Sequence, residues 1–168
     1  AEHRYDALFH VEATDVNTDG PTGAFVGTTD GQPGLAIVPL SRRGMSLEVI
    51  SGQEEPVFQG WVPGGGKYKM RPVPTPTFTA RGAGAMTMAW IVQPLRPDEA
   101  LPIVNCETLP AANGDVYVVT FSDGSAHVLL VRHEPDAAVT ADGYESRAEL
   151  TLIDRSPEGL QRRLFVLD

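Results

Sequence analysis

Apolar and polar residues alternate along most of this chain. Tyr5, Ala7, Phe9 and Val11 would share one face of an extended segment, while mainly polar residues occupy the other face. A period of two is typical of a strand with one buried face. Further segments of strand character have the ranges 35–40, 45–50, 57–62, 77–81, 86–93, 116–121, 126–132, 148–154 and 160–167.

Short turns join several of these segments. Residues 122–125 read Ser-Asp-Gly-Ser between two apolar runs, and Asp-Gly is a strong hairpin signal because the turn needs a positive φ. Residues 156–159 (Ser-Pro-Glu-Gly) are expected to form a second hairpin. The only helix candidate, residues 97–100, is at most one turn long. Roughly ten to twelve short strands predict an all-β fold, an antiparallel β-sandwich, as a single domain over residues 1–168.

Composition limits the class of protein and its partners. The chain has 168 residues, a net charge of −9 and a hydrophobic fraction of 42%, which fits one folded domain. The negative field disfavours nucleic acid and anionic membranes as partners. Cys106 is the only cysteine, so an intrachain disulfide is excluded, and its apolar neighbours favour a buried, unreactive thiol. No apolar run reaches the ~18 residues that a membrane span needs.

Catalytic motifs are absent from the sequence. It has no Gly-x-Ser-x-Gly elbow, and the Gly-rich residues 64–67 lack the spacing of a phosphate-binding loop, so no catalytic residue is assigned. His3 and His10 are seven residues apart and would face opposite sides of a straight strand. His127 and His133 would lie about 20 Å apart. His10 remains the candidate metal ligand, and the alternative for each histidine is a surface or hydrogen-bonded role.

One stretch opposes the global negative charge. The Gly- and Pro-rich residues 63–76 form the longest irregular segment, and loops of this length are usually functional or pack against a partner. Aromatic faces stack on sugar rings, and Lys or Arg pairs with uronate or sulfate groups. The candidate carbohydrate-binding residues are Trp61, Lys67, Tyr68, Lys69 and Arg71. In the alternative interpretation, the two aromatic residues anchor the loop to the sheets or to a neighbouring domain.

Several short motifs in the first hundred or so residues follow a characteristic order. Residues 59–62 (Gln-Gly-Trp-Val) precede the Gly/Pro loop, residues 74–77 (Pro-Thr-Pro-Thr) and a strand that ends at residues 93–95 (Gln-Pro-Leu). Near the start, residues 3–5 (His-Arg-Tyr) run into residues 9–11 (Phe-His-Val). This order resembles the late β-domain of heparinase II/III-like polysaccharide lyases.

The resemblance implies a larger parent enzyme. Such lyases join an α/α-toroid to antiparallel β-sheets and cleave uronate-containing polysaccharides by β-elimination. Their catalytic groups lie in the toroid and in a His-Gly-His-type motif, and no position here matches either. The chain alone is therefore expected to be non-catalytic, with the parent's catalytic domain and acidic polysaccharide as partners and a periplasmic or secreted location. Some members hold a structural zinc, to which His10 or His3 would correspond; no other cofactor is implied.

Two further hypotheses stay open beside a non-catalytic lyase domain. The chain could be an independent carbohydrate-binding module, since aromatic and basic residues gather at residues 61–71. It could also be a structural or assembly domain without a ligand, in which strand edges pair with other chains.

Overall fold

The computed structural model describes residues 1–67, 69–84 and 86–167, and all regular structure in them is β-strand. Every strand pairing is antiparallel, which confirms the all-β, sandwich-type prediction. These residues contain no helix long and apolar enough to cross a membrane. The strands are β1 (His3–Leu8), β2 (Asp15–Asp19), β3 (Ala24–Thr28), β4 (Gly34–Pro39), β5 (Met45–Ile50), β6 (Trp61–Pro63), β7 (Met70–Pro72), β8 (Thr75–Gly82), β9 (Trp90–Leu95), β10 (Ile103–Leu109), β11 (Gly114–Phe121), β12 (Ala126–Arg132), β13 (Val139–Ala141), β14 (Tyr144–Ser146), β15 (Leu150–Arg155) and β16 (Gln161–Leu167).

The sixteen strands of the described residues exceed the ten to twelve predicted. The hairpin of β2 and β3 was missed because β2 is an exposed edge strand of mainly polar residues. The three-residue strands β7, β13 and β14 were missed because they are too short to show a period of two. Strand β10 was also missed, since its apolar and polar residues do not alternate regularly. The predicted strand over residues 57–62 is wrong for residues 57–60, and only its last two residues belong to β6.

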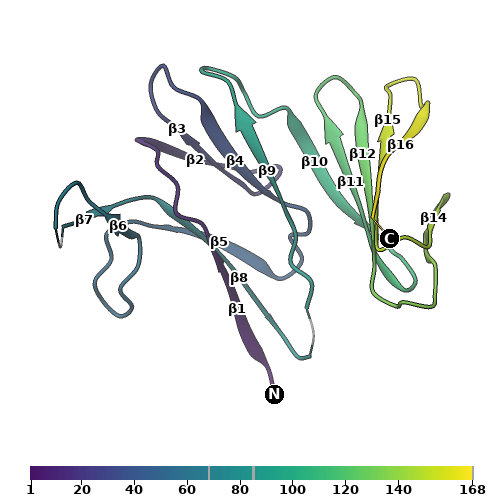
Figure 1. Ribbon diagram of the computed structural model, residues 1–168, viewed down its shortest axis with the longest axis horizontal. Coiled ribbons are helices and arrows are strands. Elements are labelled where there is room, and N and C mark those ends of the chain that lie inside the picture. The colour runs from purple at the N-terminus through teal and green to yellow at the C-terminus, as the bar shows by residue number, and fades with distance from the viewer. Residues whose placement is uncertain (68, 85, 168) are drawn as a thin grey trace. The chain divides into compact units, whose positions relative to one another are not determined.

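The chain divides into two compact units, Ala1–Leu101 (unit 1) and Pro102–Asp168 (unit 2) (Figure 1). Each unit has its own cluster of buried apolar residues. This division does not test whether residues 1–168 form a single domain, which stays a prediction.

Unit 1 is a two-layer sandwich. One layer is the three-stranded sheet β1-β8-β5, and the other is the four-stranded sheet β2-β3-β4-β9. Phe25 of β3, Ile37 of β4 and Phe78 of β8 belong to one core cluster, so both sheets contribute to the same core. The rings of Phe9, Phe78 and Trp90 contact one another within it, with centroid distances of 5.6, 5.8 and 6.1 Å. Three aromatic residues from separate segments of the chain therefore meet between the two layers.

Strand β8 is the central strand of the three-stranded sheet and alternates between two environments. Phe78 and Ala80 are buried on the core side. Thr77, Thr79 and Arg81 lie on the opposite, outer face, because successive side chains of a strand point to opposite sides. The strand therefore supports the core with one set of residues and carries a polar surface with the other.

Residues 51–73, which we call the arm, contain the two-stranded ribbon of β6 and β7. The predicted irregular stretch over residues 63–76 is therefore wrong at residues 63, 70–72 and 75–76, which belong to strands. At its base, the Gly60 carbonyl accepts hydrogen bonds from Gly52 N and Val73 N, at 3.0 and 2.9 Å. Gly60 has a φ of 78°, and a Cβ there would lie 2.9 Å from the Ser51 Cα. Only glycine fits this position without strain.

Unit 2 is built on the five-stranded sheet β10-β11-β12-β15-β16. The β13-β14 hairpin packs on one face of it, where Val128, Leu130 and Val139 belong to one buried cluster. The opposite face is also apolar, since Tyr117 and Val119 are buried there. Both predicted hairpin turns, at residues 122–125 and 156–159, are confirmed and contain a glycine with a φ of 85°.

The aromatic core of unit 1 should dominate its stability. Replacing Phe78, which is 1% exposed, by alanine should lower the free energy of unfolding by about 3–5 kcal/mol, because the substitution leaves a cavity between the layers. Urea unfolding followed by tryptophan fluorescence measures this, since Trp61 and Trp90 both lie in unit 1. Val92→Ala, at a side chain that is 53% exposed, is the control and should cost under about 0.5 kcal/mol. A loss below about 1 kcal/mol in Phe78→Ala would contradict the described core.

Candidate functional site

Trp61 holds the arm together. Its indole Nε1 donates a hydrogen bond to the Gln53 carbonyl at 3.0 Å, and its ring lies against Gly52. The ring also stacks on Phe58, with a centroid distance of 5.6 Å and an interplanar angle of 8°. Trp61 therefore packs within the arm, where its N–H already has a partner. The alternative, in which the aromatic residues anchor the loop to the sheets or to a neighbouring domain, stays a prediction.

Phe58 is the exposed aromatic residue of this pair and was not singled out from the sequence. Its side chain is 60% exposed, as is that of Val57, and Met70 on the other side of the ribbon turn is 46% exposed. The signal that could have identified Phe58 is the spacing Phe-x-x-Trp beside Gly60, which the prediction of a regular strand over residues 57–62 obscured. An apolar surface of this kind often marks a binding site.

The basic residues of the arm do not all share a face with Trp61. Trp61 is opposite Pro72 in the ribbon, while Arg71 is opposite Val62, so Trp61 and Arg71 point to different sides. Arg71 forms an ion pair with Glu12, and both side chains are largely exposed. The Lys69 side chain lies over Gly66, where a Cβ would be 3.1 Å from the lysine Cδ.

Lys67 and Tyr68 are the remaining two candidate carbohydrate-binding residues. Lys67 lies in the turn between β6 and β7, and Tyr68 lies outside the described residues. The assignment of Trp61, Lys67, Tyr68, Lys69 and Arg71 to carbohydrate binding stays a prediction, and the structure adds Phe58 as their exposed aromatic neighbour.

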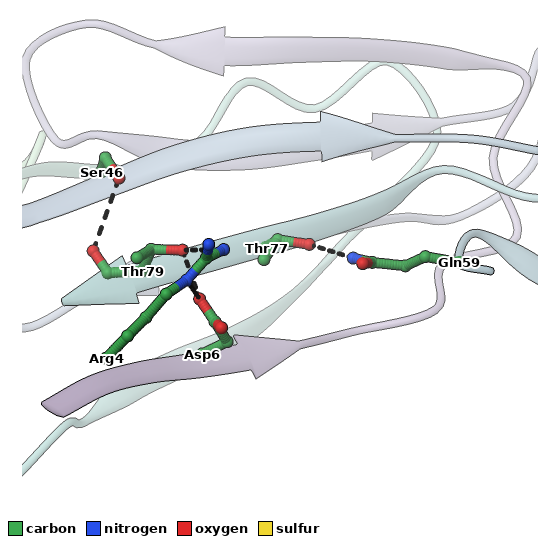
Figure 2. Close-up of polar contacts among 6 residues, drawn as sticks. All are labelled: Arg4, Asp6, Ser46, Gln59, Thr77 and Thr79. Carbon is green, nitrogen blue, oxygen red and sulfur yellow. Dashed lines mark hydrogen bonds and ion pairs between the residues drawn. The ribbon is translucent and has the colours of Figure 1, made fainter. Parts of the chain in front are cut away.

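A row of polar side chains covers the outer face of the sheet β1-β8-β5 (Figure 2). Thr79 on β8 donates a hydrogen bond to Asp6 Oδ1 on β1 at 2.5 Å, and Arg4 Nε donates to the same oxygen at 2.9 Å. Ser46 on β5 donates to the Thr79 carbonyl at 3.5 Å. These bonds cross all three strands of the sheet.

The same row continues from the sheet to the arm. Gln59 Nε2 donates a hydrogen bond of 2.7 Å to Thr77 Oγ1, which lies two residues before Thr79 on β8 (Figure 2). Thr77 is buried, so its hydroxyl needs this partner. Because Gln59 follows Phe58 in the chain, this hydrogen bond ties the segment that carries Phe58 to the strand that carries the polar row.

The hydrogen bonds and charges of this row lower the pKa of Asp6. The main cause is the hydrogen bond from Thr79, followed by the hydrogen bond and charge of Arg4 and by the charge of Arg81, while partial desolvation opposes them. Since the folded pKa lies below the ordinary value of 3.8, ionised Asp6 stabilises the fold above that pH. This contribution is lost as the pH falls through the lowered pKa.

The candidate metal ligand His10 is exposed and lies just after β1. In the part of the chain that the structure describes, no three His, Cys, Asp or Glu residues gather closely enough to hold a metal ion. The assignment of His10 to a metal site stays a prediction.

Other titratable groups lie in unit 2. His133 Nε2 is 3.1 Å from Asp115 Oδ2, beside an open hollow of about 320 Å³, and His127 Nε2 is 3.7 Å from Asp154 Oδ1. Burial raises the pKa of Cys106 to about 11, so the thiol is protonated near neutral pH. The thiol therefore lacks the lowered pKa of a cysteine nucleophile.

The hydroxyl of Thr79 should set the titration of Asp6. Thr79→Val removes the hydrogen bond that lowers the pKa most, so the Asp6 titration midpoint should rise toward 3.8. Carbon-detected NMR of the carboxyl group against pH measures the midpoint. Ser46→Ala is the matched control, because Ser46 bonds to the Thr79 carbonyl and not to Asp6. Equal midpoints in Thr79→Val and the parent protein would contradict the described hydrogen bond.

Comparison with known proteins returned no relatives. No protein-family model matches the chain, and neither a curated protein nor a solved structure does. The resemblance to heparinase II/III-like lyases stays a prediction from the sequence, and function is inferred from the geometry of the arm and the adjoining sheet.

Proposed function

We propose that this chain is a non-catalytic β-domain of a heparinase II/III-like polysaccharide lyase, which supports the catalytic part of the enzyme and contacts its polysaccharide. The observation that carries the proposal is the surface of the arm, where Phe58 is 60% exposed and stacked on the anchored Trp61. A large aromatic side chain held rigidly at the surface contributes contact area at little entropic cost.

The chemistry of this surface suits a sugar. The face of an aromatic ring carries partial negative charge, which attracts the partially positive C–H bonds on the flat side of a pyranose. Stacking on Trp61 fixes the plane of Phe58, with 8° between the rings. Arg4 and Ser46 on the outer face of the sheet are exposed and carry hydrogen-bonding groups of the kind that sugar hydroxyls need.

Charge around the arm favours an acidic saccharide. The whole chain has a net charge of −9, which repels anions at long range. Charges more than about 8 Å apart are largely screened at physiological ionic strength, so the nearest cations decide the local interaction. The arm carries Lys67, Lys69 and Arg71 against Glu54 and Glu55, which leaves it one positive charge in an acidic chain, and Glu12 shares Arg71.

The order of motifs also supports the lyase assignment, and the fold explains part of it. The Gly-Trp pair of the resemblance is Gly60 and Trp61. Gly60 closes the base of the arm with a positive φ, and Trp61 packs inside the arm. A protein that needs this arm would need both residue types at these positions.

A supporting role is favoured by a second observation. Val57, which precedes Phe58 in the chain, is 60% exposed, and Met70 of the same arm is 46% exposed. Exposed apolar groups of this kind also suit docking against another protein domain. The catalytic part of the parent enzyme is the partner that the resemblance names. Sugar binding and docking are separable, because only sugar binding is measurable with this chain alone.

Phe58→Ala should weaken polysaccharide binding by about tenfold, or about 1.4 kcal/mol, because it removes the exposed ring and leaves Trp61 bonded to Gln53. Isothermal titration calorimetry with alginate, heparin and a neutral glucan measures the affinity. Leu160→Ala is the control, since Leu160 is 75% exposed and lies in unit 2.

Three outcomes separate the hypotheses. Binding that is weakened in Phe58→Ala and unchanged in Leu160→Ala supports glycan contact at the arm. Binding that both variants retain equally places the sugar elsewhere and contradicts the proposed site. Formation of the ultraviolet-absorbing unsaturated uronate by the chain alone would contradict a non-catalytic role.

A further inference from the structure

Two arginines lie directly opposite each other on the outer face of the three-stranded sheet. Arg4 of β1 is the register partner of Arg81 of β8, and both belong to the face that carries Asp6 and Thr79. Like charges directly opposite in a sheet are destabilising, because their side chains extend side by side. An arrangement of this kind is favoured when an anion lies between or above the two groups.

The Asp6 carboxylate, an anion of the chain itself, forms a hydrogen bond with Arg4 but not with Arg81. Asp6 Oδ1 accepts the hydrogen bond of Arg4 Nε at 2.9 Å, and Arg4 Nη2 also lies 3.5 Å from Thr79 Oγ1. The side chain of Arg81 is exposed and makes no hydrogen bond or ion pair with any other described residue. It acts on Asp6 only through its charge. Arg4, Arg81 and Asp6 together carry one excess positive charge in an acidic chain.

We propose that Arg4 and Arg81 form a subsite for the carboxylate or sulfate group of an acidic saccharide. This inference deepens the proposed function and rests on it, because it names the charged group of the ligand that the arm would contact. Guanidinium groups suit this role, since their planar N–H donors match both oxygens of a carboxylate and two oxygens of a sulfate.

The geometry connects this subsite with the arm. Arg81, Thr79 and Thr77 follow one another on the same face of β8. Figure 2 shows the hydrogen bond between Thr77 and Gln59 of the arm. Arg81 and Thr77 are four residue steps apart on the strand, which is about 13 Å. A saccharide of a few units is long enough to span this distance between the arginines and the start of the arm.

Asp6 gives the inference a distinctive consequence. The Asp6 carboxylate occupies Arg4 and so competes with an external anion for the same guanidinium group. Asp6→Asn keeps the shape of the side chain and an acceptor for Thr79 and Arg4, but removes the competing charge. Binding of an external anion should therefore become stronger in this variant, which a merely structural role for the cluster does not predict.

The test uses NMR of the arginine side-chain Nε–Hε groups during titration with glucuronate, a glucose sulfate or glucose. The Arg4 and Arg81 signals should shift with glucuronate or with the sulfate, and not with glucose; the stronger of the two anions identifies the group recognised. Arg81→Gln should weaken that binding about tenfold, and Asp6→Asn should strengthen it severalfold. Arg96→Gln, which removes an exposed charge elsewhere in unit 1, is the matched control and should leave the affinity unchanged.

Arg81→Gln breaks no hydrogen bond of the described residues, so its effect is not an effect of misfolding. Absence of arginine shifts with both anions would overturn the subsite, as would equal affinities in Arg81→Gln, Asp6→Asn and the parent protein. Arginine shifts in a protein that binds no polysaccharide would contradict the proposed function and leave the subsite standing. Polysaccharide binding that Phe58→Ala weakens and Arg81→Gln does not would support the proposed function and contradict the subsite.

Discussion

Strand β8 has to satisfy two surfaces at once, and the arrangement of unit 1 results from how it does so. Its even-numbered residues Phe78 and Ala80 are buried against the four-stranded sheet, where apolar area removed from water stabilises the fold. Its odd-numbered residues Thr77, Thr79 and Arg81 are thereby fixed on the outer face in a register set by β1 and β5. A shift of one residue would exchange the two sets and bury the polar one. The packing of the core therefore also places the polar row.

The arm depends on the same sheet. It leaves the end of β5 and returns into β8, and Gln59 bonds to Thr77 at the point where the two meet. Gly60 makes that junction possible, since its carbonyl accepts two backbone hydrogen bonds in a conformation that other residues adopt only with strain. The segment that carries Phe58 is thereby bonded to the strand that carries the polar row, and this is the physical basis of the proposed contact with saccharide.

Alternation of apolar and polar residues predicted most of the local structure. The all-β class, the hairpin turns at residues 122–125 and 156–159 and the inward side of the first strand all depend on local patterns, which a single chain displays directly. The partners of each side chain could not be predicted in this way, because they depend on which strands become neighbours. Arg4 and Arg81 are 77 positions apart, and only the pairing of β1 with β8 brings them together. Phe58 was overlooked for a similar reason, since its exposure results from the stacking on Trp61 that the folded arm creates.

The most direct test of the central claim is to map backbone amide shifts during titration with an acidic oligosaccharide. The account predicts perturbations in three segments of unit 1, namely residues 4–6, residues 57–71 and residues 77–81, with the amides of unit 2 largely unaffected. Perturbations concentrated in unit 2, or in the opposite sheet β2-β3-β4-β9 of unit 1, would contradict it. Such a result would mean that the outer face of the three-stranded sheet and the arm do not form the binding surface.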